Sequence, residues 1–283
     1  GNIKIYETLR IKNKQYHKEL ILKDDSNDND FRKLKVNRLA LVGKDDKIAL
    51  SADTESSIYI YNDTTTNSVK IFPSYKSSKV IFFAGKKYTL KFSELNNERD
   101  FHDYEYLSRF HYRTLTKDKQ NDVLKNHVHG RTSIIICRII IGKQKIPVGY
   151  IQLQQPLMMC KPRHLLFNDV FEHKKRGITW SQWKINEMRK YTNLIVRIGR
   201  VVTDPEFRGI GFSKYLIEVA KKYSKKRWHI KGERPLFMEI SAEMLKYIDF
   251  VSSSNFHFVG NTEGNYKRVT SDLKHINNVI KNH

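Results

Sequence analysis

The chain has 283 residues, and its 39% hydrophobic and 12% aromatic content supports a folded core, which excludes a disordered chain. No apolar run reaches the roughly 18 residues of a membrane-spanning helix, so we expect a cytoplasmic protein without a membrane partner. Two cysteines, Cys137 and Cys160, are too few for a disulfide framework or a zinc site, and Cys137 lies in an apolar run typical of a core strand.

The net charge of +22 is concentrated in one part of the chain. Residues 1–98 hold 18 basic and 13 acidic side chains, which leaves 34 basic and 17 acidic side chains for the remainder. An excess of this size predicts a polyanionic partner, with nucleic acid first and an acidic protein or a membrane surface second. Solvated lysines without such a partner are the alternative interpretation.

Residues 1–95 are predicted to form a β-rich module. Short apolar runs recur about every ten residues between turn-forming residues, which is typical of a small sandwich or barrel. These runs cover residues 39–42, 48–50, 58–61, 69–72, 80–83 and 88–92. Residues 2–16 give no clear pattern, and the module contains no evident catalytic group.

The next part of the chain predicts a helix and a hairpin. Phe101, Tyr104 and Leu107 recur at helical spacing, which predicts a helix that ends near His111. A polar connector follows. Strands are then expected at 133–141 and 146–153, joined by a turn at residues 142–145.

Residues 154–193 form a long insertion in which basic residues are interleaved with tryptophans. A loop of this length in a compact domain usually has a function, and basic groups beside aromatic rings suit contacts with a nucleic-acid backbone and its bases. The candidate nucleic-acid contacts are Arg163, Lys174, Lys175, Arg176, Trp180 and Trp183. The alternative is a helical lid whose tryptophans pack on the sheet.

A strand, a tight turn and a helix are predicted from residue 195 to Tyr223. The β-branched run at 195–202 ends at Asp204-Pro205, because proline has no N–H to donate to a ladder. A glycine turn at 208–213 then opens a helix, and the N–H groups at such a helix start can hold a phosphate or pyrophosphate. The turn lacks the Lys-Ser/Thr pair of a Walker loop, and Lys214 stands where a dinucleotide fingerprint requires its third glycine.

This turn resembles the coenzyme A loop of the GNAT acetyltransferases, whose pattern is Arg/Gln-x-x-Gly-x-Gly/Ala. Here it is Arg208-x-x-Gly211-x-Ser213, with serine in place of the last small residue. It is preceded by Val202, Pro205 and Phe207. The order of the expected elements extends the resemblance over about residues 97–264. The alternative is a glycine turn that binds nothing.

The resemblance implies that residues 96–268 form an α/β (α+β) GNAT-like domain, with a splayed central sheet and flanking helices, that binds acetyl-CoA. It also implies that the strand expected at 236–240 diverges from the strand at 195–202. A helix at 243–251, a last strand at 256–259 and a basic helix or tail at 269–283 complete the predicted elements. The implied pyrophosphate contacts are Arg208, Gly209, Ile210, Gly211, Phe212 and Ser213. The backbone of Val201 or Val202 would bind the thioester oxygen.

Acyl transfer to an amine requires a route for the proton of the amine. The candidate groups are Glu239 on the splayed strand, Glu243 and Tyr247 on the next helix, and His111 at the end of the first helix. Glu239 could instead point outward, and His111 could be a hydrogen-bonded core histidine. Many GNAT proteins have a tyrosine five residues before the Gly-Phe that precedes the last strand, and Val251 occupies that position here.

A narrower resemblance bears on the substrate. Residues 110–113, the insertion and residues 244–250 are similar to GNAT domains attached to ABC-type ATPases, which are related to the phage DNA-modifying Mom proteins. This implies acylation of an amine on a nucleic-acid base of DNA or RNA, with an ATPase or other protein as a partner. The base would have to be flipped out or single-stranded. A protein or peptide N-acetyltransferase with an acidic substrate and a nucleic-acid-binding module without catalysis are the alternatives.

Overall fold

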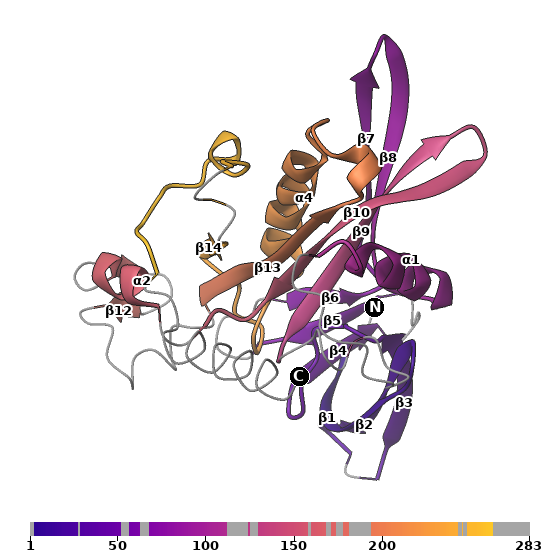
Figure 1. The fold of residues 1–283 in the computed structure, drawn as a ribbon. Helices are drawn as coiled ribbons and strands as arrows, with labels where there is room; N and C mark the ends of the chain where they lie inside the picture. Colours follow the sequence, from indigo (N-terminus) through magenta and orange to yellow (C-terminus); the bar gives the residue numbers. More distant parts are fainter. Residues whose placement is uncertain are drawn as a thin grey trace, which may run out of the picture. The chain divides into compact units, whose positions relative to one another are not determined.

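The computed structural model describes residues 3–27, 29–51, 57–62, 68–111, 124, 130–157, 160–167, 171–173, 178–180, 194–242, 245 and 248–262. The chain divides into two compact units. The first unit holds Gly1–Pro156 and Met188–Phe256, and the second holds Leu157–Glu187 and His257–His283. The described residues form two large sheets and few helices, which confirms the predicted mixed α+β class at this level (Figure 1).

Six antiparallel strands form the first sheet, in the order β3-β2-β1-β4-β5-β6. These strands are β1 (Ile3–Asn13), β2 (His17–Asp24), β3 (Phe31–Asn37), β4 (Lys47–Ser51), β5 (Ile58–Tyr61) and β6 (Ser68–Phe72). Fully buried side chains alternate with more accessible ones along β2, β5 and β6, because successive side chains point to opposite faces of a sheet. One face therefore buries an apolar cluster that includes Leu20, Leu22 and Ile48.

The predicted strands at 48–50, 58–61 and 69–72 are confirmed, whereas the strand predicted at 39–42 is wrong. The backbone there forms a turn and an irregular segment, and the carbonyls of Ala40 and Leu41 accept hydrogen bonds from the side chains of Lys18 and Arg131. The sequence pattern missed β1 because a bulge between Thr8 and Arg10 interrupts the two-residue alternation that would have indicated a strand.

The second sheet also has six strands, in the order β14-β13-β10-β9-β8-β7. These are β7 (Lys76–Phe83), β8 (Lys86–Glu94), β9 (Thr132–Ile141), β10 (Gln144–Gln154), β13 (Ile195–Thr203) and β14 (Phe237–Ile240). Only the β13–β14 pair is parallel among the described pairs. The strands predicted at 133–141, 146–153, 195–202 and 236–240 are all present.

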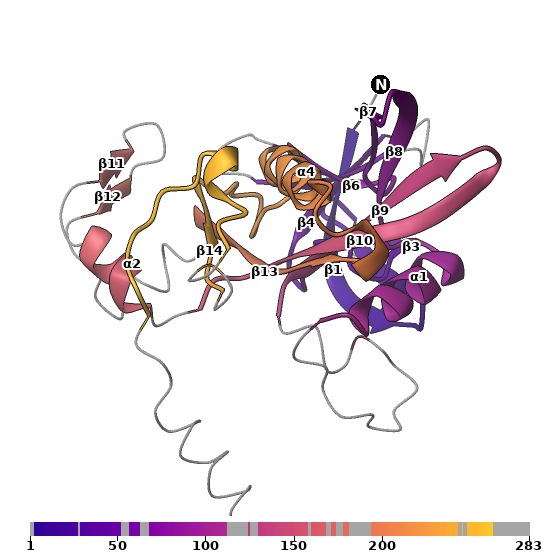
Figure 2. The same cartoon turned by 45° about the horizontal axis from the view of Figure 1, so that its top comes forward.

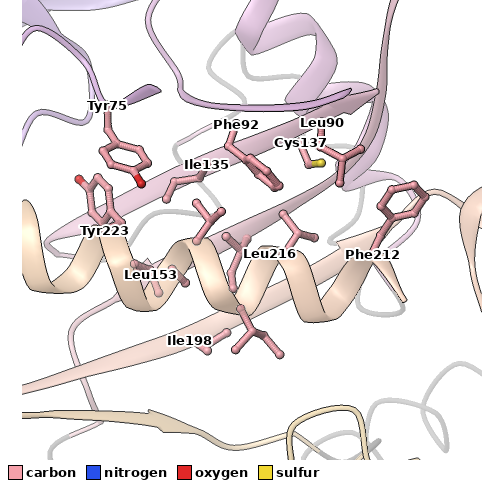
Figure 3. Close-up of a cluster of buried hydrophobic side chains, with 14 of the residues drawn as sticks. Tyr75, Leu90, Phe92, Ile135, Cys137, Leu153, Ile198, Phe212, Leu216 and Tyr223 are labelled. Atoms are coloured by element: carbon pink, nitrogen blue, oxygen red, sulfur yellow. The ribbon is translucent and has the colours of Figure 1, made fainter. Parts of the chain in front are cut away.

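β7 and β8 differ from the prediction, which placed them in the module at residues 1–95. They pair in the second sheet because Leu90 and Phe92 of β8 pack with Cys137 of β9 in its core (Figure 3). The change from the first sheet to the second therefore falls between β6 and β7 rather than at residue 95. Cys137 is a fully buried core thiol, as predicted.

Two helices cover opposite faces of the second sheet (Figure 2). α1 (Glu98–Ser108) packs against a face that includes Ile134 and Ile136, and α4 (Phe212–Lys226) packs against the face with Ile135 and Cys137. Neighbouring residues of β9 thus serve two different cores, since their side chains alternate across the strand. Asn97 caps α1 through a capping box with Asp100. Both helices confirm the predicted ones.

The second unit contains α2 (Lys161–Leu166) and the antiparallel pair β11 (Phe171–His173) and β12 (Ile178–Trp180), all within the predicted insertion. No helix in the described part of the chain is long and apolar enough to cross a membrane.

The predicted strand at 256–259 is wrong, because these residues are irregular and the Phe258 side chain is 83% exposed. Of the predicted helix at 243–251, residues 248–250 are irregular, and the 3-10 turn η5 (Ser252–Ser254) follows. Residues 243, 244, 246 and 247 and the basic tail at 269–283 lie outside the described residues.

Candidate functional site

β13 extends beyond its neighbour β14. The parallel pairs run from Ile195 with Phe237 to Ile198 with Ile240, where β14 ends. Residues 200–203 remain paired with β10 on one edge. On their other edge, no strand in the described part of the chain pairs with them. A free strand edge presents N–H and C=O groups that can bind an extended ligand.

A bulge at Gly199 lies where the two strands part. Gln152 of β10 pairs with Arg200, but the next residue, Leu153, pairs with Ile198, so Gly199 is the extra residue. A bulge bends its strand and increases the local twist. A Cβ on Gly199 would lie 2.5 Å from the Gln154 Oε1 atom, so a larger residue here requires the Gln154 side chain to move.

The ladder register shows which backbone groups of β13 face the open edge. The Asp204 N–H donates to the Val148 carbonyl at 3.0 Å, so Asp204 belongs to the residues that bond to β10. Alternate residues of an antiparallel strand direct their N–H and C=O groups to opposite edges. Val202 therefore faces β10, and Val201 and Thr203 face the open edge. The Arg208 Nε–H donates to the Thr203 carbonyl at 3.3 Å, which agrees with this assignment.

Asp204 fixes the path of the chain out of β13. Its buried carboxylate accepts hydrogen bonds from the Glu206 N–H through Oδ1, at 3.0 Å, and from the Tyr106 hydroxyl through Oδ2, at 2.7 Å. The short 3-10 turn η3 (Pro205–Phe207) follows this cap. The β-branched strand, the Asp-Pro stop and the glycine turn thus occur in the predicted order.

Two glycines in the turn have backbone conformations that other residues rarely adopt. Gly209 has φ +81° and Gly211 has φ +84°, and a Cβ built on either one would meet nothing within 4 Å. Gly211 is also the N-cap of α4 and has no side chain to cap the helix. The turn therefore requires glycine for its conformation and has open space beside the first N–H groups of the helix.

The electrostatics at this helix start favour an anion. The first turn of α4 contains no acidic residue, and the helix dipole adds partial positive charge there. Arg208 is exposed beside the turn. Phe212 is buried and its ring lies 5.9 Å from the ring of Phe207, and Ile210 packs against the same core, so these two side chains anchor the turn. Phe212 and Ile210 would therefore contact an anion through their backbone N–H groups.

The structure describes two of the four catalytic candidates, Glu239 and His111, and they lie on different elements. Glu239 is the register partner of Arg197, in the part of β14 that is still paired with β13. His111 is half-buried after the end of α1, and its backbone N–H donates to the Ser108 carbonyl at 3.2 Å. Glu243 and Tyr247 lie outside the described residues.

Tyr106 is a functional candidate that the sequence analysis missed. It lies on the polar face of α1, is 40% exposed, and donates its hydroxyl proton to Asp204 directly after β13. Its hydrogen bond with Asp204, followed by partial burial, raises the Tyr106 pKa. The hydroxyl is therefore a donor at neutral pH, and it positions the turn. Its place on the solvent side of a predicted helix gave no sequence signal.

The predicted nucleic-acid contacts fall in the second unit. Arg163 is only 4% exposed and donates a hydrogen bond to the Leu157 carbonyl. The backbone of Trp180 lies in β12. Lys174, Lys175, Arg176 and Trp183 lie outside the described residues.

Two hairpins of the second sheet carry lysines and exposed apolar side chains. The β7–β8 and β9–β10 hairpins project and diverge at their ends in both views (Figures 1 and 2). Residues 76–93 and 139–147 contain no acidic residue. Their exposed lysines are Lys76, Lys86, Lys87, Lys91, Lys143 and Lys145. Phe82 is 77% exposed at the end of β7. Cations around an exposed aromatic ring suit a phosphate backbone and a stacked base.

No protein-family model matches the chain, and no curated protein sequence matches it. The interpretation of the site therefore depends on its geometry and on the sequence pattern of the turn.

Proposed function

We propose that the chain is a GNAT-like N-acyltransferase that transfers the acetyl group of acetyl-CoA to an amine, with nucleic acid as the acceptor. The observation that carries this proposal is the junction of two features at one end of β13: an open strand edge at residues 199–203 and a glycine turn with open space before α4. The first suits an extended chain such as pantetheine, and the second suits a pyrophosphate.

The residues at this junction fit coenzyme A. Side chains at Gly209 and Gly211 would fill the space that a pyrophosphate needs, and the structure has none there. The N–H groups of residues 209–213 and the Arg208 guanidinium would bind the phosphates. Bound acetyl-CoA supplies an activated acyl group as a thioester.

The chain's own contribution at the reacting end is a backbone donor. The N–H of Val201 faces the open edge and would bind the thioester oxygen, whereas the N–H of Val202 faces β10. An oriented N–H at the site where negative charge develops is an effective form of electrostatic catalysis. Tyr106 and Asp204 would hold the end of β13 in place while this contact forms.

Nucleic acid is favoured as the acceptor because of the charge distribution. The excess of basic residues lies mainly after residue 98, and the two lysine-bearing hairpins belong to the same sheet as β13. A protein acceptor would require an acidic segment to satisfy the same cations.

Incubation with acetyl-CoA and either single-stranded DNA, duplex DNA, tRNA or an acidic peptide, followed by mass spectrometry, tests the proposal. We expect an added acetyl group on a nucleic acid, and single strands should react faster than duplexes. Acetylation of the peptide alone would favour the protein acetyltransferase. Tight nucleic-acid binding without acetylation of any substrate would favour a non-catalytic binding module.

A further inference from the structure

One face of the two projecting hairpins combines lysines with an exposed aromatic ring. The hairpins, β7–β8 and β9–β10, lie entirely within the described residues. Residues that pair directly in an antiparallel sheet place their side chains on the same face. By this register, one face, here called the hairpin face, presents Val80 and Phe82 of β7, Lys87 and Lys91 of β8, Ile140 of β9 and Lys145 of β10.

The hairpin face is the side of the sheet that α1 covers nearer its centre. Lys91 pairs with Arg138, whose guanidinium donates hydrogen bonds to carboxylates of α1. Beyond this point the hairpins project past the helix (Figures 1 and 2). Val80 is 45% exposed and Phe82 is 77% exposed, whereas Ile81 between them points into the core under α4. The aromatic ring therefore lies on an uncovered part of the sheet.

The lysines of the two faces differ in their partners. On the α4 side, the Lys79 Nζ lies 2.6 Å from a carboxylate oxygen of Glu218 and 4.5 Å from the centre of the Tyr215 ring. On the hairpin face, the lysines are exposed and form no ion pair with any carboxylate in the described part of the chain. These cations are therefore accessible to an anionic partner.

We propose that the hairpin face binds a single-stranded nucleic acid, with one base stacked on Phe82 and phosphates beside the lysines. Stacking on a side chain requires an unstacked base, which a single strand offers and a duplex does not. Lys87 and Lys91 lie about 14 Å apart along β8, so the cations follow the strand instead of gathering at the turn, which suits an extended phosphate backbone. A second copy of the chain would bring like charges together.

The hairpin face lies at the end of the sheet where β13 ends. Gly149 of β10 pairs with Thr203, the last residue of β13. Lys145 precedes Gly149 on β10 by about 14 Å of strand length. A nucleic acid bound here could thus extend to the proposed coenzyme A site. Its role as the acceptor rests on the proposed function, whereas its binding to the hairpins does not.

Fluorescence anisotropy with the full chain, in the absence of acetyl-CoA, tests the binding. The probes are a labelled oligothymidine and a duplex of the same length. We expect Phe82→Ala to weaken oligothymidine binding by about five- to 150-fold, because a base–aromatic stack is lost, and to leave duplex affinity unchanged. The matched control is Phe83→Ala, which removes a 50% exposed ring from the opposite face and should bind oligothymidine like the parent.

A second pair of variants tests the phosphate contacts. The double variant Lys91→Met and Lys145→Met should make the negative slope of log affinity against log salt concentration smaller in magnitude by about 1.4 for the single strand. The control removes the same charge from the first sheet through Lys33→Met and Lys35→Met, which replace exposed lysines of β3. It should keep the slope of the parent.

Three results would overturn the proposal: equal oligothymidine affinity in Phe82→Ala and Phe83→Ala, equal salt slopes in the two lysine variants, or no oligothymidine binding by the parent. In the last case, Phe82-dependent binding to phosphatidylserine vesicles or to polyglutamate would assign the face to a membrane surface or an acidic protein. Because no acetyl-CoA is present, these results are independent of the transferase. Binding as expected, without acetylation of any nucleic acid, would contradict only the proposed function.

Discussion

Two clusters of charged side chains in the described part of this chain have opposite charge balances. Arg138 of β9 donates to Asp103 and to Asp100 of α1, both at 2.6 Å, and also to the Ser93 hydroxyl at 2.9 Å. The cluster around Lys18 instead gathers three cations near one carboxylate. In the first cluster the cation has two carboxylate partners within the chain, and these ion pairs join a helix to a sheet. The second holds Lys18, Arg38 and Arg131 near the carboxylate of Asp46.

The largest effect on stability is expected from replacing Arg138. Arg138→Met leaves two carboxylates without their cation in a mostly buried site, so we expect the free energy of unfolding to fall by about 3–5 kcal/mol. Urea unfolding monitored by circular dichroism measures this. The control Arg99→Met removes an exposed arginine of α1, the helix that carries Asp100 and Asp103. It should change the free energy of unfolding by less than about 0.5 kcal/mol. Equal losses in both variants would show that Arg138 is not a structural cation.

Replacing Lys18 should raise the free energy of unfolding, whereas replacing Arg138 should lower it. Lys18→Met removes an ammonium group whose pKa is lowered by burial and by repulsion from Arg131 and Arg38, so at pH 7 we expect a gain of about 1–3 kcal/mol in the free energy of unfolding. The folded-state pKa of about 8 lies below the usual 10.5, so between these values the unfolded chain binds more protons and the parent becomes more stable as pH rises. The gain should therefore shrink over this range. A loss of stability at pH 7 would contradict the assignment.

The exposed lysines of the β7–β8 hairpin are compared next, as cations without a buried partner group. Lys86→Met with Lys87→Met, on the β7–β8 hairpin, should leave the free energy of unfolding unchanged within about 0.5 kcal/mol. If the hairpin binds nucleic acid, affinity for duplex DNA should depend less steeply on salt. The negative slope of log affinity against log salt concentration should become smaller in magnitude by about 1.8. The matched control replaces Lys225 and Lys226, exposed in the last turn of α4, and should keep the slope. Equal slopes in both double variants would place the interface elsewhere.

The smallest expected effect on ligand binding is at Tyr106, whose hydroxyl bonds to Asp204 directly after β13. Tyr106→Phe removes one hydrogen bond to the buried Asp204 carboxylate, which should cost about 1–2 kcal/mol of stability. Acetyl-CoA affinity should fall by less than about tenfold, because the glycine turn itself is unchanged. Thermal unfolding and calorimetry measure the two quantities. A complete loss of acetyl-CoA binding would contradict the positioning role and would indicate that Tyr106 contacts the cofactor directly.

The elements with a strong local pattern could be predicted from the sequence. The β-branched run before Asp204, the paired glycines and the helical spacing after them placed β13, the turn and α4 correctly. The same local information could not show the strand partners. β7 and β8 have ordinary strand patterns, and their membership of the second sheet depends on Leu90 and Phe92 meeting Cys137, which lies far along the chain.

The functional groups were less predictable than the fold. The open edge of β13 arises because β14 ends early, and the sequence of β13 alone does not show this. Register then distinguishes Val201 from Val202, which are identical residues. The cluster around Lys18 joins residues from three distant segments, so their proximity could not be inferred from spacing. The sequence also does not reveal that the Arg163 side chain is buried.

Calorimetric titration with acetyl-CoA tests the proposed cofactor site most directly. It compares the native chain with Gly211→Trp and with Gly142→Trp, since Gly142 also has positive φ and open space but lies in the β9–β10 turn. We expect the native chain and Gly142→Trp to bind alike and Gly211→Trp to lose affinity by about a hundredfold or more, because its indole would displace at least two charge-assisted contacts. No binding by the folded native chain, or equal binding by all three, would contradict a coenzyme A site at this turn.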